Sequence, residues 1–453
     1  MLFAAYAATL GVHAFNRSRF TPTEARTLLT ARSIVRDGDV DLTNQYRQRQ
    51  YAGFYPFRLA PRGHVTRGRL DDPRGPGLPL LLAPAYALAG PTGAQLELAA
   101  LAALAFVLAI AIARRLVPEP WATAGPLLCG LSPPALAYAT AISPQLPAGA
   151  ALAGAVLLAL RARDRPRLAP ALGCGALLAV LPWLGTEFLV PLVPVAVALA
   201  WWMGRQRRGW YALVGLDVVL ASLVAFATAN ERLYGGVVPE AAGAPLTGAA
   251  NAGDYLDRVP RLLALWIDRD AGLLRWAPVF ALAFVGAWLL WRSRRDRVAR
   301  AVPDQRNVEA VALVLVLVCA AQVLVALLMP ALKGLWFPGR SLVAALPCAG
   351  ALVAWALRFV PRWLSTVLGG LTLVASAWLL VALRVGDAGW VAPASRAPWG
   401  PLEIVFPRYG AGSVYATVVS VLVAAGLVAL VANEWRQHRA LQGMARRAFL
   451  TQR

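Results

Sequence analysis

The segment 20–46, FTPTEARTLLTARSIVRDGDVDLTNQY, places four carboxyl side chains directly after a hydrophobic opening, MLFAAYAATLGVHAF. A carboxylate within hydrogen-bond reach of a hydroxyl group can act as a general base. Glu24 also stands three residues after Thr21, with Pro22 between them, which is the spacing of a capping box at a helix start. Because a carboxylate bonded to backbone N–H groups is a weak base, the capping and catalytic roles of Glu24 compete. Both interpretations stay open here.

The same pattern predicts one helix that begins near Pro22 and stops at Gly38. Its apolar stripe would consist of Leu28, Leu29, Ile34 and Val35. Its solvent-exposed face would carry Arg26, Arg32 and Arg36. A helix of this kind lies along a membrane surface, where arginine is well suited to meet phosphate groups.

The stretch DDPRGPG offers a different chemistry, since Asp71 and Asp72 could hold a divalent cation. Two adjacent acids in a loop are more often a solvated turn. Other metal or redox centres are not indicated. The histidines are far apart in the sequence, and the cysteines lie in apolar runs without a C-x-x-C pair (His13, His64, His438; Cys129, Cys174, Cys319, Cys348).

The composition indicates which kind of fold must position these residues. The chain has 453 residues, of which 59% are hydrophobic, and a mean hydropathy of +0.58. Soluble domains contain a smaller fraction of apolar residues. We therefore expect an all-α polytopic integral membrane protein with the lipid bilayer as a partner. The net charge of +21 does not indicate nucleic-acid binding, because the arginines lie mainly in short loops between apolar runs.

Apolar runs of membrane-spanning length predict about 12 transmembrane helices in a single domain, 1–453. The runs cover 2–15, 94–115, 121–140, 145–161, 167–183, 186–203, 209–229, 273–292, 309–330, 341–358, 363–385 and 412–433. The stretch 77–90 is interrupted by proline and glycine and is interpreted as a half-helix that leads into the second span.

The charges of the loops predict the orientation. Short basic segments fall on one side if the spans alternate, and that side should be cytoplasmic (161–167, 205–208, 292–300, 358–362 and the tail 434–453). Both termini are then cytoplasmic. The extracytoplasmic side receives the long first loop 16–93, with its interfacial helix, and the loops 230–272 and 386–411.

Asp217 is the acid that stands out within a predicted span. Ionisable groups inside a membrane usually pair with one another or mark a transport pathway. A transporter or lipid flippase is therefore an alternative function.

Several stretches resemble the GT-C class of polyprenyl-phosphate-sugar-dependent glycosyltransferases, which includes protein O-mannosyltransferases and lipid A aminoarabinose transferases. No single stretch is specific; their order over most of the chain carries the resemblance. They are LLTARSIVRDGDVDLTNQY (28–46), RGPGLPLLLAPAYALAG (74–90), LPWLGTEF (181–188), LYGGVVPE (233–240), DRDAGLLRWAPVF (268–280) and LWFPGRSLVAALP (335–347).

The resemblance implies a bacterial plasma-membrane enzyme with an extracytoplasmic active site. It would transfer a sugar, with inversion, from an undecaprenyl- or decaprenyl-phosphate donor to a lipid, glycan or protein acceptor. No cofactor is required, although a divalent cation is possible. Relatives carry an acidic pair at the start of the surface helix, where this chain has Thr23 and Glu24. The base is then Glu24 or one of the nearby acids Asp37, Asp39 and Asp41. Alternatively, the chain is a non-catalytic relative that only binds lipid-linked sugar.

The departing lipid phosphate needs a cationic partner, and arginine can supply two parallel hydrogen bonds. Arg340 in FPGRS is the first candidate, Arg74 in DDPRGPG the second and Lys333 the third. For each of them, anchoring to lipid headgroups is the alternative role.

Overall fold

The computed structural model describes residues 1–14, 18–62, 65, 68–242, 252–256, 258–298, 305–329, 334–385, 389–390, 405–409 and 413–451. These residues form helices and no β-strand, as the apolar composition predicted. The helices are α1 (Leu2–Ala7), α2 (Pro22–Asp37), α3 (Thr43–Arg47), η1 (Gln50–Gly53), α4 (Gly77–Ala113), α5 (Trp121–Gly130), α6 (Pro133–Thr140), α7 (Gln145–Asp164), α8 (Leu168–Leu184), η2 (Thr186–Phe188), α9 (Leu189–Arg205), α10 (Gly209–Tyr234), η3 (Pro239–Ala242), α11 (Ala252–Leu256), α12 (Arg261–Ile267), η4 (Pro278–Phe280), α13 (Ala281–Val298), α14 (Gln305–Leu328), η5 (Arg340–Ala345), α15 (Leu346–Phe359), α16 (Arg362–Val385) and α17 (Val414–Thr451).

Within the described ranges, eight helical segments are long and apolar enough to cross a membrane, so the chain is a membrane-embedded helical protein. They are Gly77–Ala113, Gln145–Asp164, Thr186–Arg205, Gly209–Ala241, Val308–Leu328, Arg340–Phe359, Arg362–Val385 and Val414–Arg436. Leu168–Leu184 and Pro278–Leu290 are shorter apolar helices. The count of about twelve spans stays a prediction.

Two of the predicted runs differ from the helices observed. The run 2–15 gives only the short helix α1, which ends at Ala7. The run 121–140 is divided into α5 and α6 at Ser132, which has an extended backbone with ψ of 151°. Pro133 follows, and a proline disfavours helical geometry in the residue before it.

α4 begins at Gly77, so the segment 16–93 is not a loop throughout. The backbone leaves helical geometry at Ala89 and Gly90, just before Pro91, and this kink divides a first short arm from the long apolar arm. The stretch 77–90 is therefore a half-helix that leads into a span, as predicted.

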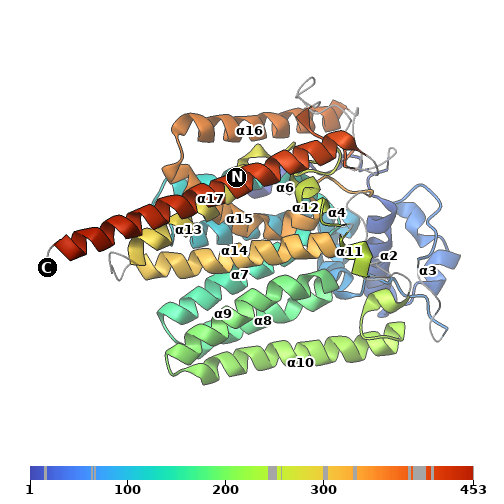
Figure 1. The fold of residues 1–453 in the computed structure, drawn as a ribbon. Helices are drawn as coiled ribbons and strands as arrows, with labels where there is room; N and C mark the ends of the chain where they lie inside the picture. The colour runs from blue at the N-terminus through green and yellow to red at the C-terminus, as the bar shows by residue number, and fades with distance from the viewer. Residues whose placement is uncertain are drawn as a thin grey trace.

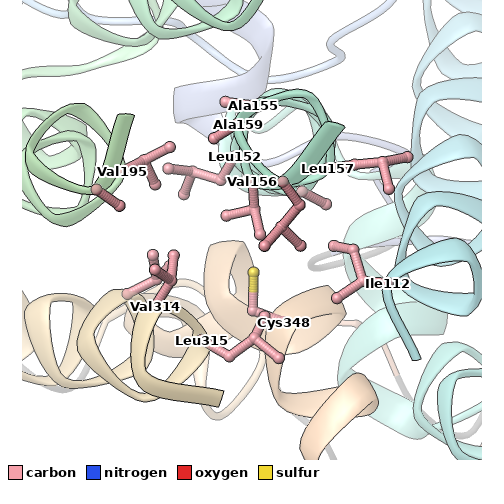
Figure 2. Packing of buried hydrophobic residues seen from close by; sticks show 14 of the residues in the cluster. Ile112, Leu152, Ala155, Val156, Leu157, Ala159, Val195, Val314, Leu315 and Cys348 are labelled. Atoms are coloured by element: carbon pink, nitrogen blue, oxygen red, sulfur yellow. The ribbon is translucent and has the colours of Figure 1, made fainter. Parts of the chain in front are cut away.

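The centre of the bundle is formed around α7, which is buried along most of its length. Figure 2 shows Leu152 and Val156 of α7 pointing toward Leu315 of α14 and Cys348 of α15. These four residues are fully buried. Ala155 and Ala159 on the same helix are also buried, and small residues such as these let neighbouring helices approach closely in a membrane.

α2 and α3 lie together at one end of the bundle, beside the start of α4 (Figure 1). α7, α8, α9 and α10 run lengthwise beside one another away from that end. α7 has 20 residues, which corresponds to a length of about 30 Å. The basic α7–α8 and α9–α10 loops consequently lie at the opposite end from α2.

Candidate functional site

The start of α2 has the predicted capping box. Thr21 is the N-cap, Pro22 is the first helical residue, and the Thr21 N–H donates to Glu24 Oε2 at 2.8 Å while the Glu24 N–H donates to Thr21 Oγ1 at 3.2 Å. The helix ends at Gly38, whose φ of 73° is the left-handed conformation that glycine adopts most easily. The predicted helix and both of its ends are confirmed.

Glu24 has a second structural contact. Its Oε1 accepts a hydrogen bond from the backbone N–H of Ile142 at 2.8 Å, which ties α2 to the segment between α6 and α7. The residue is only 3% exposed. Burial raises the pKa of this carboxyl, while the N–H donors and the positive charge of Arg74 oppose the rise. Both oxygens of Glu24 are thus held by backbone groups.

The apolar stripe of α2 packs inside the protein instead of facing a membrane surface. Leu28 contacts a cluster that includes Leu78 and Leu82 of α4, and Leu29 contacts a second cluster around Tyr51. Val35, at the far end of the helix, remains exposed. α4 and the residues after α3 therefore cover most of this stripe, and the position of α2 along a membrane surface stays a prediction.

The other predicted acids of this segment stabilise the turn after α2. Asp37 Oδ2 accepts from the side-chain amides of Asn44 and Gln45, at 3.0 and 2.6 Å. Asp39 accepts from Ser33 Oγ at 2.8 Å. Asp41 Oδ1 accepts from the N–H groups of Thr43 and Leu70, both at 3.0 Å. None of Asp37, Asp39 and Asp41 is among the residues lining the cavity described next.

A cavity of about 350 Å³ lies next to α2, between the first residues of α4 and the connections that precede α7, α9 and α15. Apolar side chains such as Leu78, Val190 and Val325 line part of it. Its charged lining residues come from segments far apart in the sequence and are Arg62, Asp72, Arg74, Glu187, Glu240 and Arg340.

Two of the predicted phosphate-binding residues meet at this cavity. The guanidinium carbon of Arg340 lies 4.3 Å from the centre of the Trp336 ring, and that of Arg74 lies 5.6 Å from the same ring. Arg74 also donates to Thr23 Oγ1 at 3.2 Å. Burial lowers the pKa of Arg74 to about 10, with Asp72 opposing and Arg340 adding to the decrease. Arg74 therefore keeps its positive charge at neutral pH.

Arg340 retains hydrogen-bonding capacity. Its Nε is buried, and it has no hydrogen-bond partner among the described residues. A buried N–H of this kind is costly unless a ligand or a water satisfies it. Together with the charge of Arg74, this free donor makes the neighbourhood of Trp336 suited to an anion.

The chain before and after Arg340 is held by three long-range hydrogen bonds. Tyr138 OH donates to Phe337 O at 2.8 Å, the Gly339 N–H donates to Ala271 O at 3.2 Å, and Gln322 Nε2 donates to Ser341 O at 2.7 Å. Gly339 has a φ of 82°, which favours glycine at this turn. The position of Arg340 is thus set by α6, α14 and the loop after α12.

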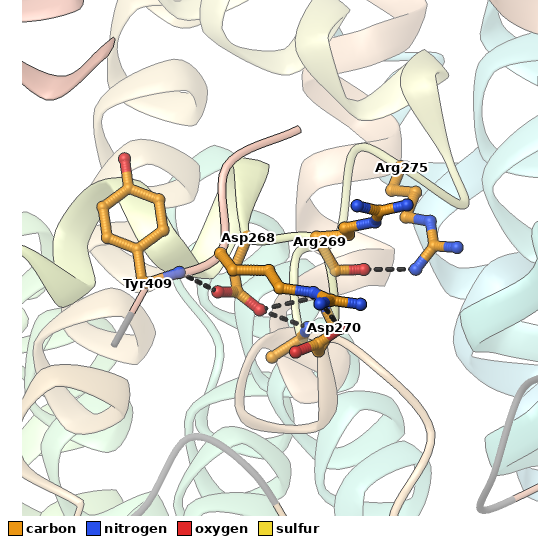
Figure 3. A network of polar contacts seen from close by, with 7 residues as sticks. Asp268, Arg269, Asp270, Arg275 and Tyr409 are labelled. Carbon is orange, nitrogen blue, oxygen red and sulfur yellow. Dashed lines mark hydrogen bonds and ion pairs between the residues drawn. The ribbon is translucent and has the colours of Figure 1, made fainter. Parts of the chain in front are cut away.

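The loop after α12 is itself ordered by a buried carboxylate (Figure 3). Asp268 Oδ1 accepts from the N–H groups of Asp270 and Ala271, at 2.8 and 2.7 Å. Its Oδ2 accepts from the Tyr409 N–H at 2.8 Å, and the residue is 1% exposed. Because Ala271 supplies the carbonyl that binds Gly339, this polar network supports the segment that carries Arg340.

Three predicted residues remain to be placed, namely Lys333, Asp71 and Asp72. Lys333 lies outside the described residues. Asp72 lines the cavity, and its Oδ1 accepts from the Arg74 N–H at 3.3 Å. Both oxygens of Asp71 are buried without a hydrogen-bond partner in the described part of the chain. Within the same part, no group of three or more His, Cys, Asp or Glu side chains is placed to hold a metal ion.

Asp217 is exposed on α10. It lines an open groove with Arg69 and Arg232, away from the cavity that contains Arg74 and Arg340. The buried mid-bundle position expected of a transport residue is therefore not observed.

Sequence reasoning did not select three residues of the cavity region, namely Glu187, Trp336 and Glu240. The signal that could have identified them was present. They lie in LPWLGTEF, LWFPGRSLVAALP and LYGGVVPE, three of the stretches that carry the resemblance to glycosyltransferases.

Comparison with known proteins gives matches among solved structures. No family model matches the chain, and no curated protein matches it significantly. ArnT from Cupriavidus metallidurans bound to undecaprenyl phosphate superposes with a TM-score of 0.55 at 15% identity, over 87% of this chain and 65% of that chain. ArnT from the same organism in the apo state gives a TM-score of 0.50 at 16% identity, over 86% and 65%.

The chain thus spans 65% of the length of either ArnT structure. At this level of identity the likeness concerns the fold. The chain has the fold of ArnT, which is the GT-C fold that the sequence resemblance implied.

Proposed function

We propose that this chain is a membrane glycosyltransferase that uses a polyprenyl-phosphate-linked sugar as its donor. Three observations support the proposal: the apolar helical bundle, the fold shared with an ArnT that binds undecaprenyl phosphate, and a cavity that contains paired arginines. The acceptor would be a hydroxyl group of an extracytoplasmic lipid, glycan or protein.

The observation that carries the proposal is the pair Arg74 and Arg340 on one indole ring, that of Trp336. Two guanidinium groups of like charge repel each other, so their approach is favourable when an anion lies between them. Planar guanidinium groups bind phosphate through two hydrogen bonds each and also stack on aromatic faces. A lipid phosphate bound here would accept a hydrogen bond from the buried Nε of Arg340 and would balance the positive charge of Arg74.

The same pair fits the chemistry of the transfer. In an inverting reaction the acceptor oxygen forms a bond to the anomeric carbon as the bond to the phosphate oxygen breaks. The electron pair of the broken bond remains on the lipid phosphate, where negative charge develops. Cations placed at that position stabilise the transition state more than the ground state, and this difference accelerates the reaction.

The proposed orientation places this cavity on the extracytoplasmic side. The cavity lies at the α2 end of the bundle, and the basic α7–α8 and α9–α10 loops lie at the other end. Since basic loops usually remain in the cytoplasm, both termini would be cytoplasmic in a bacterial plasma membrane.

A test uses the full chain in lipid nanodiscs. The measurement is transfer of label from a panel of radiolabelled polyprenyl-phosphate pentoses and hexoses, in parallel with binding of undecaprenyl phosphate. Binding with transfer is the expected result. Binding without transfer from any donor would favour the non-catalytic lipid-sugar-binding alternative, and absence of both would exclude the proposal.

A further inference from the structure

Two carboxylates in the cavity have no role in phosphate binding. Glu187 belongs to η2, and Glu240 belongs to η3, which follows α10. They are linked through Thr186, which directly precedes Glu187 and donates a hydrogen bond to Glu240. Both line the cavity that also contains Arg74 and Arg340, so they are candidates for a chemical role there.

Each of the two carboxylates is oriented through one oxygen. Thr186 Oγ1 donates to Glu240 Oε1 at 2.6 Å, and Gln145 Nε2 donates to Glu187 Oε1 at 2.5 Å. The other oxygen of Glu240, Oε2, is buried and has no hydrogen-bond partner among the described residues. A carboxylate that is held at one oxygen and free at the other is placed to accept a proton from a bound molecule.

Two other carboxylates near the cavity have different surroundings. Both oxygens of Glu24 accept backbone hydrogen bonds, which makes it a weak base. Burial raises the pKa of Asp72, and the positive charges of Arg74, Arg26 and Arg62 oppose this rise, so Asp72 lies beside the arginines that would bind the phosphate. Glu240 instead accepts through Oε1 from Thr186, a neutral hydroxyl, and its buried Oε2 has no hydrogen-bond partner among the described residues.

We propose that Glu240 is the general base for the acceptor hydroxyl, with Thr186 as its positioning residue and Glu187 as the neighbouring carboxylate. The inference rests on the proposed function. The acceptor O–H proton passes to Glu240 Oε2, and the acceptor oxygen bonds to the anomeric carbon. The bond from that carbon to the lipid phosphate breaks, and its electron pair stays on the phosphate held by Arg74 and Arg340.

The test compares Glu240→Gln and Glu240→Asp with Glu231→Gln, a matched control at an exposed glutamate on α10. Undecaprenyl phosphate binding and transfer from the radiolabelled donors are measured across pH. Glu240→Gln should bind the lipid as the unmodified protein does and lose roughly 10²–10⁴-fold in transfer rate. It should also lose the acidic limb of the pH profile, and Glu240→Asp should restore part of the rate. Glu231→Gln should behave like the unmodified protein.

Thr186→Val provides a second measurement if Glu240→Gln does not fold. Loss of the Thr186 hydrogen bond should move the acidic limb of the pH profile while lipid binding persists, which a purely structural role would not do. Transfer by Glu240→Gln at the unmodified rate, or an unmoved acidic limb in a folded Thr186→Val, overturns the inference alone. An unmodified protein that binds no undecaprenyl phosphate or transfers no sugar overturns the proposed function, and the inference with it.

Discussion

Arg74 donates a hydrogen bond to the hydroxyl oxygen of Thr23 at 3.2 Å. Thr23 occupies the position at which the GT-C resemblance implies an acid. With an acid there, Arg74 would form an ion pair inside the protein. With a neutral hydroxyl, Arg74 has no such ion pair at Thr23, and the base for the proposed reaction would have to be another residue.

Thr23→Asp should therefore weaken binding of lipid phosphate. The new carboxylate would neutralise Arg74, and a loss of about 1.5 kcal/mol corresponds to roughly a tenfold weaker Kd for undecaprenyl phosphate. Thr23→Val is the matched control, because it removes the hydrogen bond without adding charge, and it should change Kd less. Equal or tighter binding by Thr23→Asp would contradict the proposed role of Arg74.

Arg340→Ala should lower the transfer rate by about 10²–10³-fold, since it removes a donor to the charge that develops on the leaving phosphate. Arg340→Lys should also be harmful, because a single ammonium replaces a planar, two-pronged donor that stacks on Trp336. Arg36→Ala is a suitable control, as it removes an exposed arginine from α2. Unchanged transfer by Arg340→Ala would remove this residue from the site and leave headgroup anchoring as its role.

Local features of the chain were readable from the sequence. The helix over residues 22–37 follows from Thr21, Pro22, Glu24 and Gly38, because capping acts between residues that are close along the chain. The break between α5 and α6 was not predicted, although its local signal is present in the Ser-Pro-Pro of residues 132–134.

The cavity could not be derived in the same way. Arg74, Glu187, Glu240 and Arg340 meet through packing between distant segments, and no spacing rule connects them. The environment of α2 was likewise not predictable, since an apolar stripe that faces a membrane and one that packs against α4 have the same sequence pattern. The sequence supplied candidate residues in separate segments, and only the tertiary structure shows which of them lie in the same cavity.

Asp71 should make stability depend on pH. Burial raises its pKa from 3.8 to about 6, so the folded state binds more protons than the unfolded state between these values. Stability consequently falls as pH rises through that window, and the deficit is complete above about pH 6. Asp71→Asn removes the charge and should stabilise the protein by roughly 2–3 kcal/mol at neutral pH.

Thermal unfolding of the two proteins in detergent, measured from about pH 4 to about pH 8, tests this expectation. Their Tm values should converge at the acidic end and separate at neutral pH. A constant Tm difference across the range would mean that Asp71 does not titrate as expected.

The proposed orientation predicts which residues react with a membrane-impermeant maleimide in intact cells. Arg47→Cys, at the exposed end of α3, should be labelled from outside. Arg165→Cys, in the α7–α8 loop, should be labelled only after permeabilisation. The unmodified protein gives the background from its own cysteines. The reverse pattern would place the Arg74–Arg340 cavity on the cytoplasmic side.

Glu24→Gln separates the structural role of Glu24 from a catalytic one. Glutamine has a single side-chain carbonyl oxygen, so it can accept from the N–H of Thr21 or of Ile142 but not equally well from both. An unsatisfied buried N–H costs about 1–3 kcal/mol, so the variant should have a lower Tm and retain transfer. Thr21→Ala, which removes the other half of the capping box, should cost about 0.5–2 kcal/mol and also retain transfer. If Glu24→Gln abolishes transfer while its Tm stays unchanged, Glu24 is the base, and the assignment of that role to Glu240 is wrong.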